Sequence, residues 1–103
     1  MNEDAVFKRY DVRGKYPEEL NEEFAERIGK SLGTFVKRNY SSKVAVTRDT
    51  KKSSVSLKNS LIEGLTSTGV DVIDAGVGPT DYTGFVGEKE ECVSVQVTSS
   101  HMP

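Results

Sequence analysis

Hydrophobic residues recur at helical spacing in two stretches of the chain. From Asn21 to about Lys37 they fall on one face, at Phe24, Ile28, Leu32 and Phe35 or Val36. Asn21 suits the N-cap, and the two glutamates that follow it favour the positive end of the helix dipole. A second helix is predicted from about Ser54 and ends near Gly69, with apolar positions at Leu57, Leu61, Ile62 and Leu65.

Other segments have the composition of strands. Lys43–Thr47 and Val70–Ala75 are rich in β-branched residues, and glycines and a proline follow the second. Cys92–Val97 alternates, so that its three valines share one face. Ala5–Lys8 is interpreted as a possible edge strand. Thr80–Gly87 is ambiguous, because its glycines weaken a helix that its first residue is able to cap.

The order strand, helix, strand, helix, strand is the βαβ pattern, in which helices connect parallel strands. It predicts a three-layer α/β/α sandwich with a mixed, mostly parallel sheet of about four strands and helices on both faces. A chain of 103 residues buries a single core, so residues 1–103 are predicted to form one domain.

Charge and cysteine content narrow the function. Sixteen acidic and fourteen basic residues give a formal net charge of -2, which argues against nucleic acid or an anionic membrane as the main partner. No apolar run is long enough to span a bilayer, and the first residues are acidic where a signal peptide is basic. The lone Cys92 is interpreted as a buried thiol in a reducing compartment, so we expect a cytoplasmic protein.

The segment Thr98–Pro103 gathers three hydroxyls and an imidazole directly after the last predicted strand. In open α/β sheets ligands bind at the carboxyl ends of strands, and such a loop is able to hold a phosphate. The same composition is also ordinary turn chemistry. Ser100 next to His101 does not by itself make a nucleophile and base, because such pairs are matched in space. With one histidine in the chain, a zinc hydrolase is disfavoured.

Two further segments offer charge for an anion. Arg13, next to Gly14, fits a bidentate phosphate clamp, or else half of a surface ion pair with Asp11. The segment 47–54 follows a strand and opens a helix, so it fits an anion site, or else a polar connection capped by Ser53 or Ser54.

Taken in order, these segments resemble the first domain of the α-D-phosphohexomutases, the phosphoglucomutase/phosphomannomutase family. The last segment, 98–103, resembles the family's loop Thr-Ala-Ser-His-Asn-Pro, and 10–14 resembles Tyr-Asp-Ile-Arg-Gly. The stretch 20–33 resembles a helix of the family, 48–54 resembles Arg-Asp-Thr-Arg-x-Ser-Ser, and 64–80 continues the order with Gly-Leu, Gly-Val-Asp-Val and Gly-x-x-Pro-Thr. The resemblance covers nearly the whole chain.

The chain departs from the family pattern at several positions. In the signature loop Ser99 stands in place of alanine or glycine, and Met102 in place of asparagine. Elsewhere the departures are Thr47 for glycine, Lys51 for arginine and Asp81 for proline. The loop retains its serine, histidine and proline, but its geometry and the substrate subgroup stay open.

The resemblance implies an enzyme that interconverts hexose 1-phosphates and 6-phosphates through a phosphoserine at Ser100 and a hexose 1,6-bisphosphate. It implies that Arg13 is catalytic and offsets phosphate charge, and that Tyr10, Arg13 and His101 bind substrate. It also implies that His101 shapes the loop and hydrogen-bonds near the phosphate. It also implies Mg²⁺ on the phosphoserine oxygens, with carboxylates supplied by later domains. Within the chain only Asp71 and Asp74 suggest a metal, and they are interpreted as solvated.

The family's magnesium loop, sugar-recognition loop and final phosphate-binding loop have no counterpart among these residues. We therefore expect the amino-terminal domain of a larger mutase, inactive alone, whose partners are a hexose phosphate and the remaining mutase domains. Two alternatives stay open: a solitary α/β domain that binds an anion or partner without catalysis, and a hydrolase using Ser100 and His101. The identity of the hexose and the oligomeric state stay open too.

Overall fold

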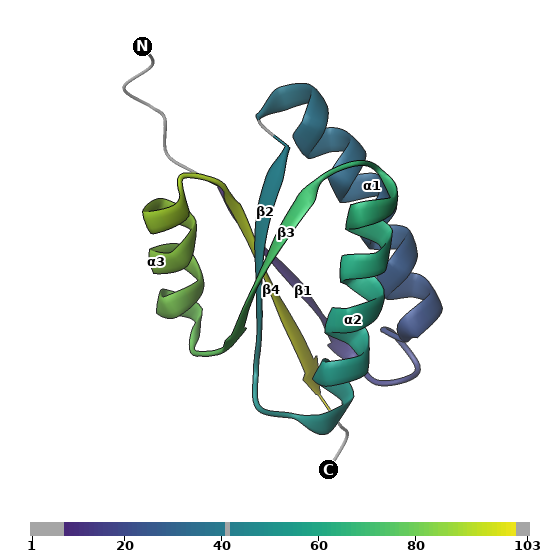
Figure 1. The fold of residues 1–103 in the computed structure, drawn as a ribbon. Coiled ribbons are helices and arrows are strands. Elements are labelled where there is room, and N and C mark those ends of the chain that lie inside the picture. The colour runs from purple at the N-terminus through teal and green to yellow at the C-terminus, as the bar shows by residue number, and fades with distance from the viewer. Residues whose placement is uncertain (1–7, 41, 101–103) are drawn as a thin grey trace.

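A four-stranded parallel sheet lies between helices in the computed structural model, which describes residues 8–40 and 42–100 (Figure 1). The elements are β1 (Arg9–Lys15), α1 (Glu22–Asn39), β2 (Lys43–Arg48), α2 (Lys52–Ser67), β3 (Asp71–Val77), α3 (Thr80–Glu90) and β4 (Val93–Ser100). The strand order is β1-β4-β2-β3, and every pairing between the described strands is parallel. The α/β/α prediction is confirmed.

The two faces of the sheet are covered unequally. Helices α1 and α2 cover one face and α3 covers the other (Figure 1). The larger core lies under α1 and α2 and contains three fully buried valines from β4 together with three leucines from α2, namely Val93, Val95, Val97, Leu57, Leu61 and Leu65. The smaller core, under α3, consists of Ala45, Val86 and Cys92 with partly buried neighbours. The predicted face of valines and the buried thiol are therefore confirmed.

The helices begin and end close to their predicted limits. The side chain of Asn21 caps α1, because its Oδ1 accepts a hydrogen bond of 2.9 Å from the amide of Phe24. Helix α2 begins at Lys52, two residues before the predicted start, and Gly69, with φ of 94°, follows its end as expected. The ambiguous segment forms the 11-residue helix α3, whose first helical residue is Thr80, the position predicted as a cap.

Strand limits differ more from the predictions. Strand β4 does not end at Val97 but continues to Ser100, because the edge strand β1 pairs with it from Ser94 to Ser100. The edge strand in the described part of the chain is Arg9–Lys15, and residues 5–7 of the predicted strand Ala5–Lys8 lie outside the described residues. Strand β3 also runs on to Val77, across a register shift in its pairing with β2.

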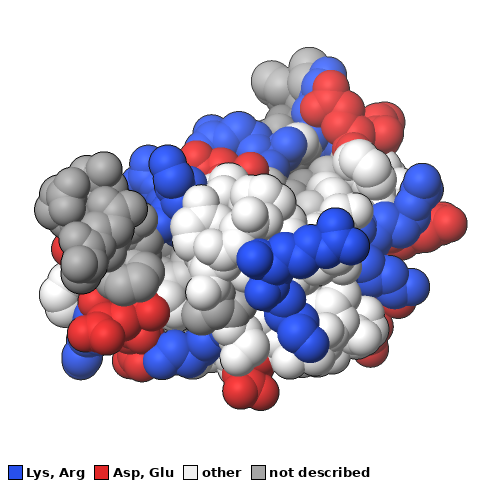
Figure 2. Space-filling view, turned by 90° about the horizontal axis from the view of Figure 1, so that it is seen from above, with Lys and Arg blue, Asp and Glu red and all other residues white. Residues whose placement is uncertain are grey.

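The described surface carries both signs of charge. Figure 2 shows lysine and arginine side chains next to aspartate and glutamate side chains on the face that it presents. None of the helices in the described parts of the chain is long and apolar enough to cross a membrane.

Candidate functional site

The carboxyl ends of the strands border a pocket with a volume of about 520 Å³. All four strands or the loops that follow them contribute to its lining, which consists of Arg13, Asp49, Thr50, Lys51, Val77, Gly78, Pro79, Gln96 and Thr98. Parallel sheets bind ligands at this edge, because the loops of several βα units meet there. The pocket is therefore the candidate functional site.

The edge strand β1 contributes Arg13 to the lining of this pocket. Arg13 is aligned with Thr98 of β4, and its side chain is 61% exposed. Its guanidinium lies 3.9 Å from the carboxylate of Asp11. Such an exposed and long ion pair contributes little free energy. The position of Arg13 is thus compatible with both hypotheses, a phosphate clamp and a surface ion pair with Asp11. Its guanidinium remains accessible to an anion that enters the pocket.

Ser100 is the last residue of β4, and its backbone is aligned with Lys15 at the end of β1. It follows two residues after Thr98, which lines the pocket. His101 and the two residues that follow it in the signature loop lie outside the described residues. Arg13 and Ser100 are therefore at the same edge of the sheet, on neighbouring strands.

Tyr10 is not brought to that edge. It is aligned with Val95, five residues before Ser100 and roughly 16 Å away along the strand. Tyr10 is half-buried against the larger core. Burial, and then a hydrogen bond with Tyr40 beyond α1, raise the pKa of the Tyr10 phenol. Within these residues Tyr10 packs against the core, away from the pocket.

Asp49 ties the end of β2 to the end of β4. Its amide donates to the carbonyl of Val97 at 3.1 Å, and its Oδ2 accepts from the amide of Ser99 at 3.2 Å. Its Oδ1 accepts from the amide of Lys51 at 3.0 Å. Both carboxylate oxygens are therefore hydrogen-bond acceptors for the backbone, and one of the two bonds spans 50 residues of sequence.

Three serine hydroxyls meet next to this bond. The Oγ of Ser99 lies 2.6 Å from that of Ser53 and 2.8 Å from that of Ser54, which are in the first turn of α2. Ser99 and Ser54 are fully buried. The prediction that Ser53 or Ser54 caps this helix is wrong, because Lys51 occupies the N-cap position and makes no side-chain capping bond. The two hydroxyls bond to β4 instead.

Sequence reasoning missed the roles of Asp49 and Gln96 at this edge. Gln96 is buried on β4, and its Nε2 donates to the carbonyl of Gly78 at 3.1 Å. From the sequence, Asp49 is part of a segment predicted to bind an anion or to connect a strand to a helix. The available signal for Asp49 was its position directly after a buried strand. The partner of Asp49 is 50 residues away in sequence and that of Gln96 is 18 residues away, so both become evident only from the sheet order.

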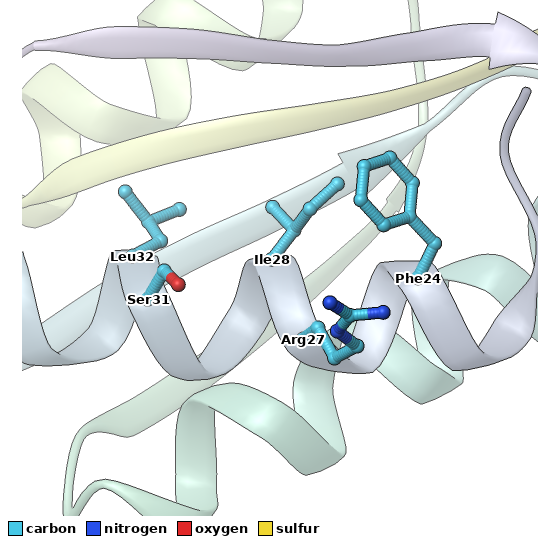
Figure 3. A pocket seen from close by; sticks show the side chains of 5 residues that line it. All are labelled: Phe24, Arg27, Ile28, Ser31 and Leu32. Atoms are coloured by element: carbon cyan, nitrogen blue, oxygen red, sulfur yellow. The ribbon is translucent and has the colours of Figure 1, made fainter.

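A second hollow, of about 410 Å³, lies along α1. Its lining consists of Phe24, Arg27, Ile28, Ser31 and Leu32 (Figure 3). Figure 3 shows the three apolar side chains in a row on the side of the helix that faces the strands. No carboxylate lines it, and one helix supplies every lining residue. It lacks the convergent polar groups of the first pocket.

The described residues do not form a metal centre by themselves. Among residues 8–40 and 42–100, no three histidine, cysteine, aspartate or glutamate side chains gather closely enough to hold a metal ion. Asp71 is exposed, and the carboxylate of Asp74 lies 2.7 Å from the Nζ of Lys58. The described residues alone therefore do not fit a Mg²⁺ site.

Comparison with known proteins identifies the fold at the level of a family. Residues 4–103 match the family model described as phosphoglucomutase/phosphomannomutase, alpha/beta/alpha domain I. This chain belongs to the phosphoglucomutase/phosphomannomutase family. Its resemblance to that family's first domain, including the α/β/α architecture, is thereby confirmed.

Relatives within the family carry different names. A probable phosphoglucosamine mutase of Thermococcus gammatolerans is 43% identical over 93 residues, which are 89% of this chain and 20% of that protein. A phosphomannomutase of Escherichia coli is 38% identical over 110 residues, with all of this chain and 22% of the relative covered. The chain thus spans about a fifth of the length of these mutases.

A solved structure of the family shares the fold. A phosphoglucomutase/phosphomannomutase family protein of Burkholderia thailandensis superposes with a TM-score of 0.68 and 36% sequence identity. The match covers 84% of this chain and 19% of that one.

Proposed function

We propose that this chain is the first domain of a phosphohexomutase and that Ser100 carries the phosphoryl group. The observation that carries the proposal is the alignment of β1 with β4, in which Arg13 and Ser100 reach the same edge of the sheet next to a polar pocket. Membership of the family and the names of the relatives support it.

In the proposed reaction Ser100 is the catalytic nucleophile. Its oxygen attacks a phosphorus atom of a hexose 1,6-bisphosphate, the bond from that phosphorus to the sugar oxygen breaks, and the hydroxyl proton of the serine ends on that oxygen. The phosphoserine then returns its phosphoryl group to the other end of a hexose monophosphate by the reverse exchange. Transfer of this kind depends mainly on positioning and on neutralising charge.

Arg13 is proposed to bind the transferring phosphate, since guanidinium groups match phosphate oxygens in charge and geometry. His101 is proposed to shape the loop beside the phosphate. Tyr10 retains its proposed contact with substrate only if the loop or another domain reaches it, because it lies well away from the pocket. Mg²⁺ on the phosphate oxygens requires carboxylates from outside the described residues.

The mutase proposal also predicts what surrounds the chain. The reading frame is expected to continue past Pro103 into the further domains of a mutase, which complete the site and select the sugar. The protein is expected in the cytoplasm, with a hexose phosphate as substrate. The relatives are named for glucosamine and mannose phosphates, so both sugars belong in the assay.

The test is phosphorylation of Ser100 in the full-length protein. It is incubated with glucose 1,6-bisphosphate or mannose 1,6-bisphosphate, and the phosphorylated peptide is located by mass spectrometry. We expect one phosphoryl group on Ser100 and conversion of a hexose 1-phosphate to the 6-phosphate. Ser100→Ala removes both, whereas Ser67→Ala, an exposed serine at the end of α2, changes neither. Full activity in Ser100→Ala overturns the proposal.

A further inference from the structure

The carboxylate of Asp49 extends the pairing of β2 with β4 beyond the end of the two strands. The backbone register between them ends at Arg48 and Val97. One position further the amide of Asp49 still reaches the carbonyl of Val97, at 3.1 Å. The next amide of β4 that points this way, that of Ser99, meets the Asp49 Oδ2 at 3.2 Å. A side-chain oxygen thus replaces the backbone carbonyl that β2 no longer supplies.

Asp49 is itself held in place. Its Oδ1 accepts from the amide of Lys51 at 3.0 Å, which turns the chain from β2 toward α2. The Nζ of Lys51 lies 3.7 Å from Oδ2, and the Asp49 side chain is 18% exposed. A carboxylate is acceptor-only, so it is able to serve two amides at once. An asparagine side chain has one acceptor oxygen and presents an NH₂ donor to the second amide.

Ser99 is consequently fixed from three directions. Strand β1 pairs with it at Gly14, Asp49 accepts from its amide, and its hydroxyl lies within 2.8 Å of the hydroxyls of Ser53 and Ser54. Ser99 is fully buried, and the next residue is Ser100. The backbone that leads into Ser100 is therefore anchored by one negatively charged side chain and two hydroxyls.

We propose that Asp49 is a positioning residue for phosphoryl transfer at Ser100. It acts through the backbone of Ser99 and does not itself touch the phosphate. The inference rests on the proposed mutase function, because it concerns the serine that this function makes the nucleophile. Misplacement of a reacting group by about 1 Å is able to slow a reaction on the order of 10²-fold.

The test compares Asp49→Asn with Asp71→Asn in the full-length protein. Asp71 is an exposed carboxylate at the start of β3, so the control makes the same chemical change at the opposite end of the sheet. Single-turnover transfer from glucose 1,6-bisphosphate to Ser100 is measured by rapid quench. We expect the rate constant at saturation to fall on the order of 10²-fold in Asp49→Asn, with the half-saturating bisphosphate concentration unchanged. In Asp71→Asn we expect neither to change.

Asp49→Glu keeps the charge and moves the carboxylate by one methylene. If Asp49→Asn does not fold, the transfer rate of Asp49→Glu tests whether Asp49 positions Ser100. All rates are taken below the thermal midpoint of each variant. A wild-type rate in Asp49→Glu or in folded Asp49→Asn overturns the positioning role while leaving the mutase function intact. Absence of any phosphoryl group on Ser100 in the wild-type protein overturns the mutase function and this inference with it.

Discussion

Gly29 of α1 and Gly64 of α2 lie where the backbones of the two helices come into close contact. A Cβ atom on Gly64 would collide with the carbonyl oxygen of Glu26, and one on Gly29 would collide with the carbonyl oxygen of Leu61. Both contacts are with backbone, which cannot rotate away as a side chain does. The close packing of α1 on α2 therefore depends on these two glycines.

Gly64→Ala is expected to destabilise the protein by about 1–3 kcal/mol, because the added methyl group has to push the helices apart. Gly84→Ala is the matched control within α3, where the nearest atom to an added Cβ is the Arg9 Cδ, at 4.0 Å. There alanine is expected to stabilise by about 0.5–1 kcal/mol, since glycine is the poorer helix former. Urea denaturation measures both. Equal effects of the two changes would contradict this account of the interface.

A carboxylate at the start of α1 makes stability depend on pH. The Glu22 Oε2 accepts from the Ser56 hydroxyl at 2.7 Å and from the Tyr16 phenol at 2.8 Å. These two bonds, that of Ser56 first, hold the pKa of Glu22 below its ordinary value. Because the folded pKa is lowered, the bonds stabilise the protein above the ordinary carboxyl pKa, and this stabilisation is lost as the pH falls through the folded value.

We therefore expect Glu22→Gln to be less stable than the wild type at pH 7, with the difference shrinking as the pH is lowered through the carboxyl range. Thermal midpoints from pH 7 down to pH 3 measure it. Glu63→Gln, at an exposed position on α2, provides the control for loss of one negative charge. A difference between Glu22→Gln and wild type that stays constant with pH would rule out the role given to the carboxylate.

Helix α3 is joined to the sheet by a buried pair of hydroxyls. The Oγ1 atoms of Thr47 on β2 and Thr83 on α3 lie 2.5 Å apart, and both residues are fully buried. Thr47→Val leaves the Thr83 hydroxyl without this partner, which is expected to cost about 1–3 kcal/mol. The double variant with Thr83→Val is expected to recover most of that loss, because both polar groups are then removed. A double-mutant cycle by urea denaturation with purely additive losses would contradict the coupling.

If the mutase proposal holds, a substitution at Arg13 is expected to slow phosphoryl transfer while leaving the stability of the protein nearly unchanged. The exposed Arg13 side chain makes a long ion pair with Asp11, and among residues 8–40 and 42–100 it has no closer charged partner, so Arg13→Gln is expected to change stability by less than about 0.5 kcal/mol. Phosphorylation of Ser100 in the full-length protein is expected to slow on the order of 10²-fold, because a charge that stabilises the transferring group is lost. Arg27→Gln, an exposed arginine on α1, is the control. Equal transfer rates in these two variants would exclude Arg13 from the site.

The central elements of the fold were predictable because each one repeats its apolar residues at one period. Phe24, Ile28 and Leu32 mark α1 in this way, and the valines of β4 mark a strand. The ends of strands were not predictable, because a strand ends where its neighbour stops pairing. Ser100 belongs to β4 only because Lys15 lies next to it, 85 positions earlier in the sequence.

Part of the candidate site could likewise be predicted from the sequence, and part could not. The motifs containing Arg13 and Ser100 were evident in the sequence, and the register of β1 with β4 places both at one edge. The bond between Asp49 and Ser99 was not predictable, since it depends on β4 lying next to β2. The distance of Tyr10 from that edge likewise follows from the register. Tyr10 and Arg13 belong to one sequence motif, and the motif alone does not show that they lie at different distances from the edge.

The sheet order β1-β4-β2-β3 has a consequence for synthesis on the ribosome. Strand β4 is made last of the four, yet it lies between β1 and β2 and joins them. Before its residues leave the exit tunnel, β1 has no neighbouring strand and the larger core lacks Val93, Val95 and Val97. The nascent domain is thus expected to stay open until the segment that contains Ser100 emerges, so that closure of the sheet and completion of the candidate site coincide.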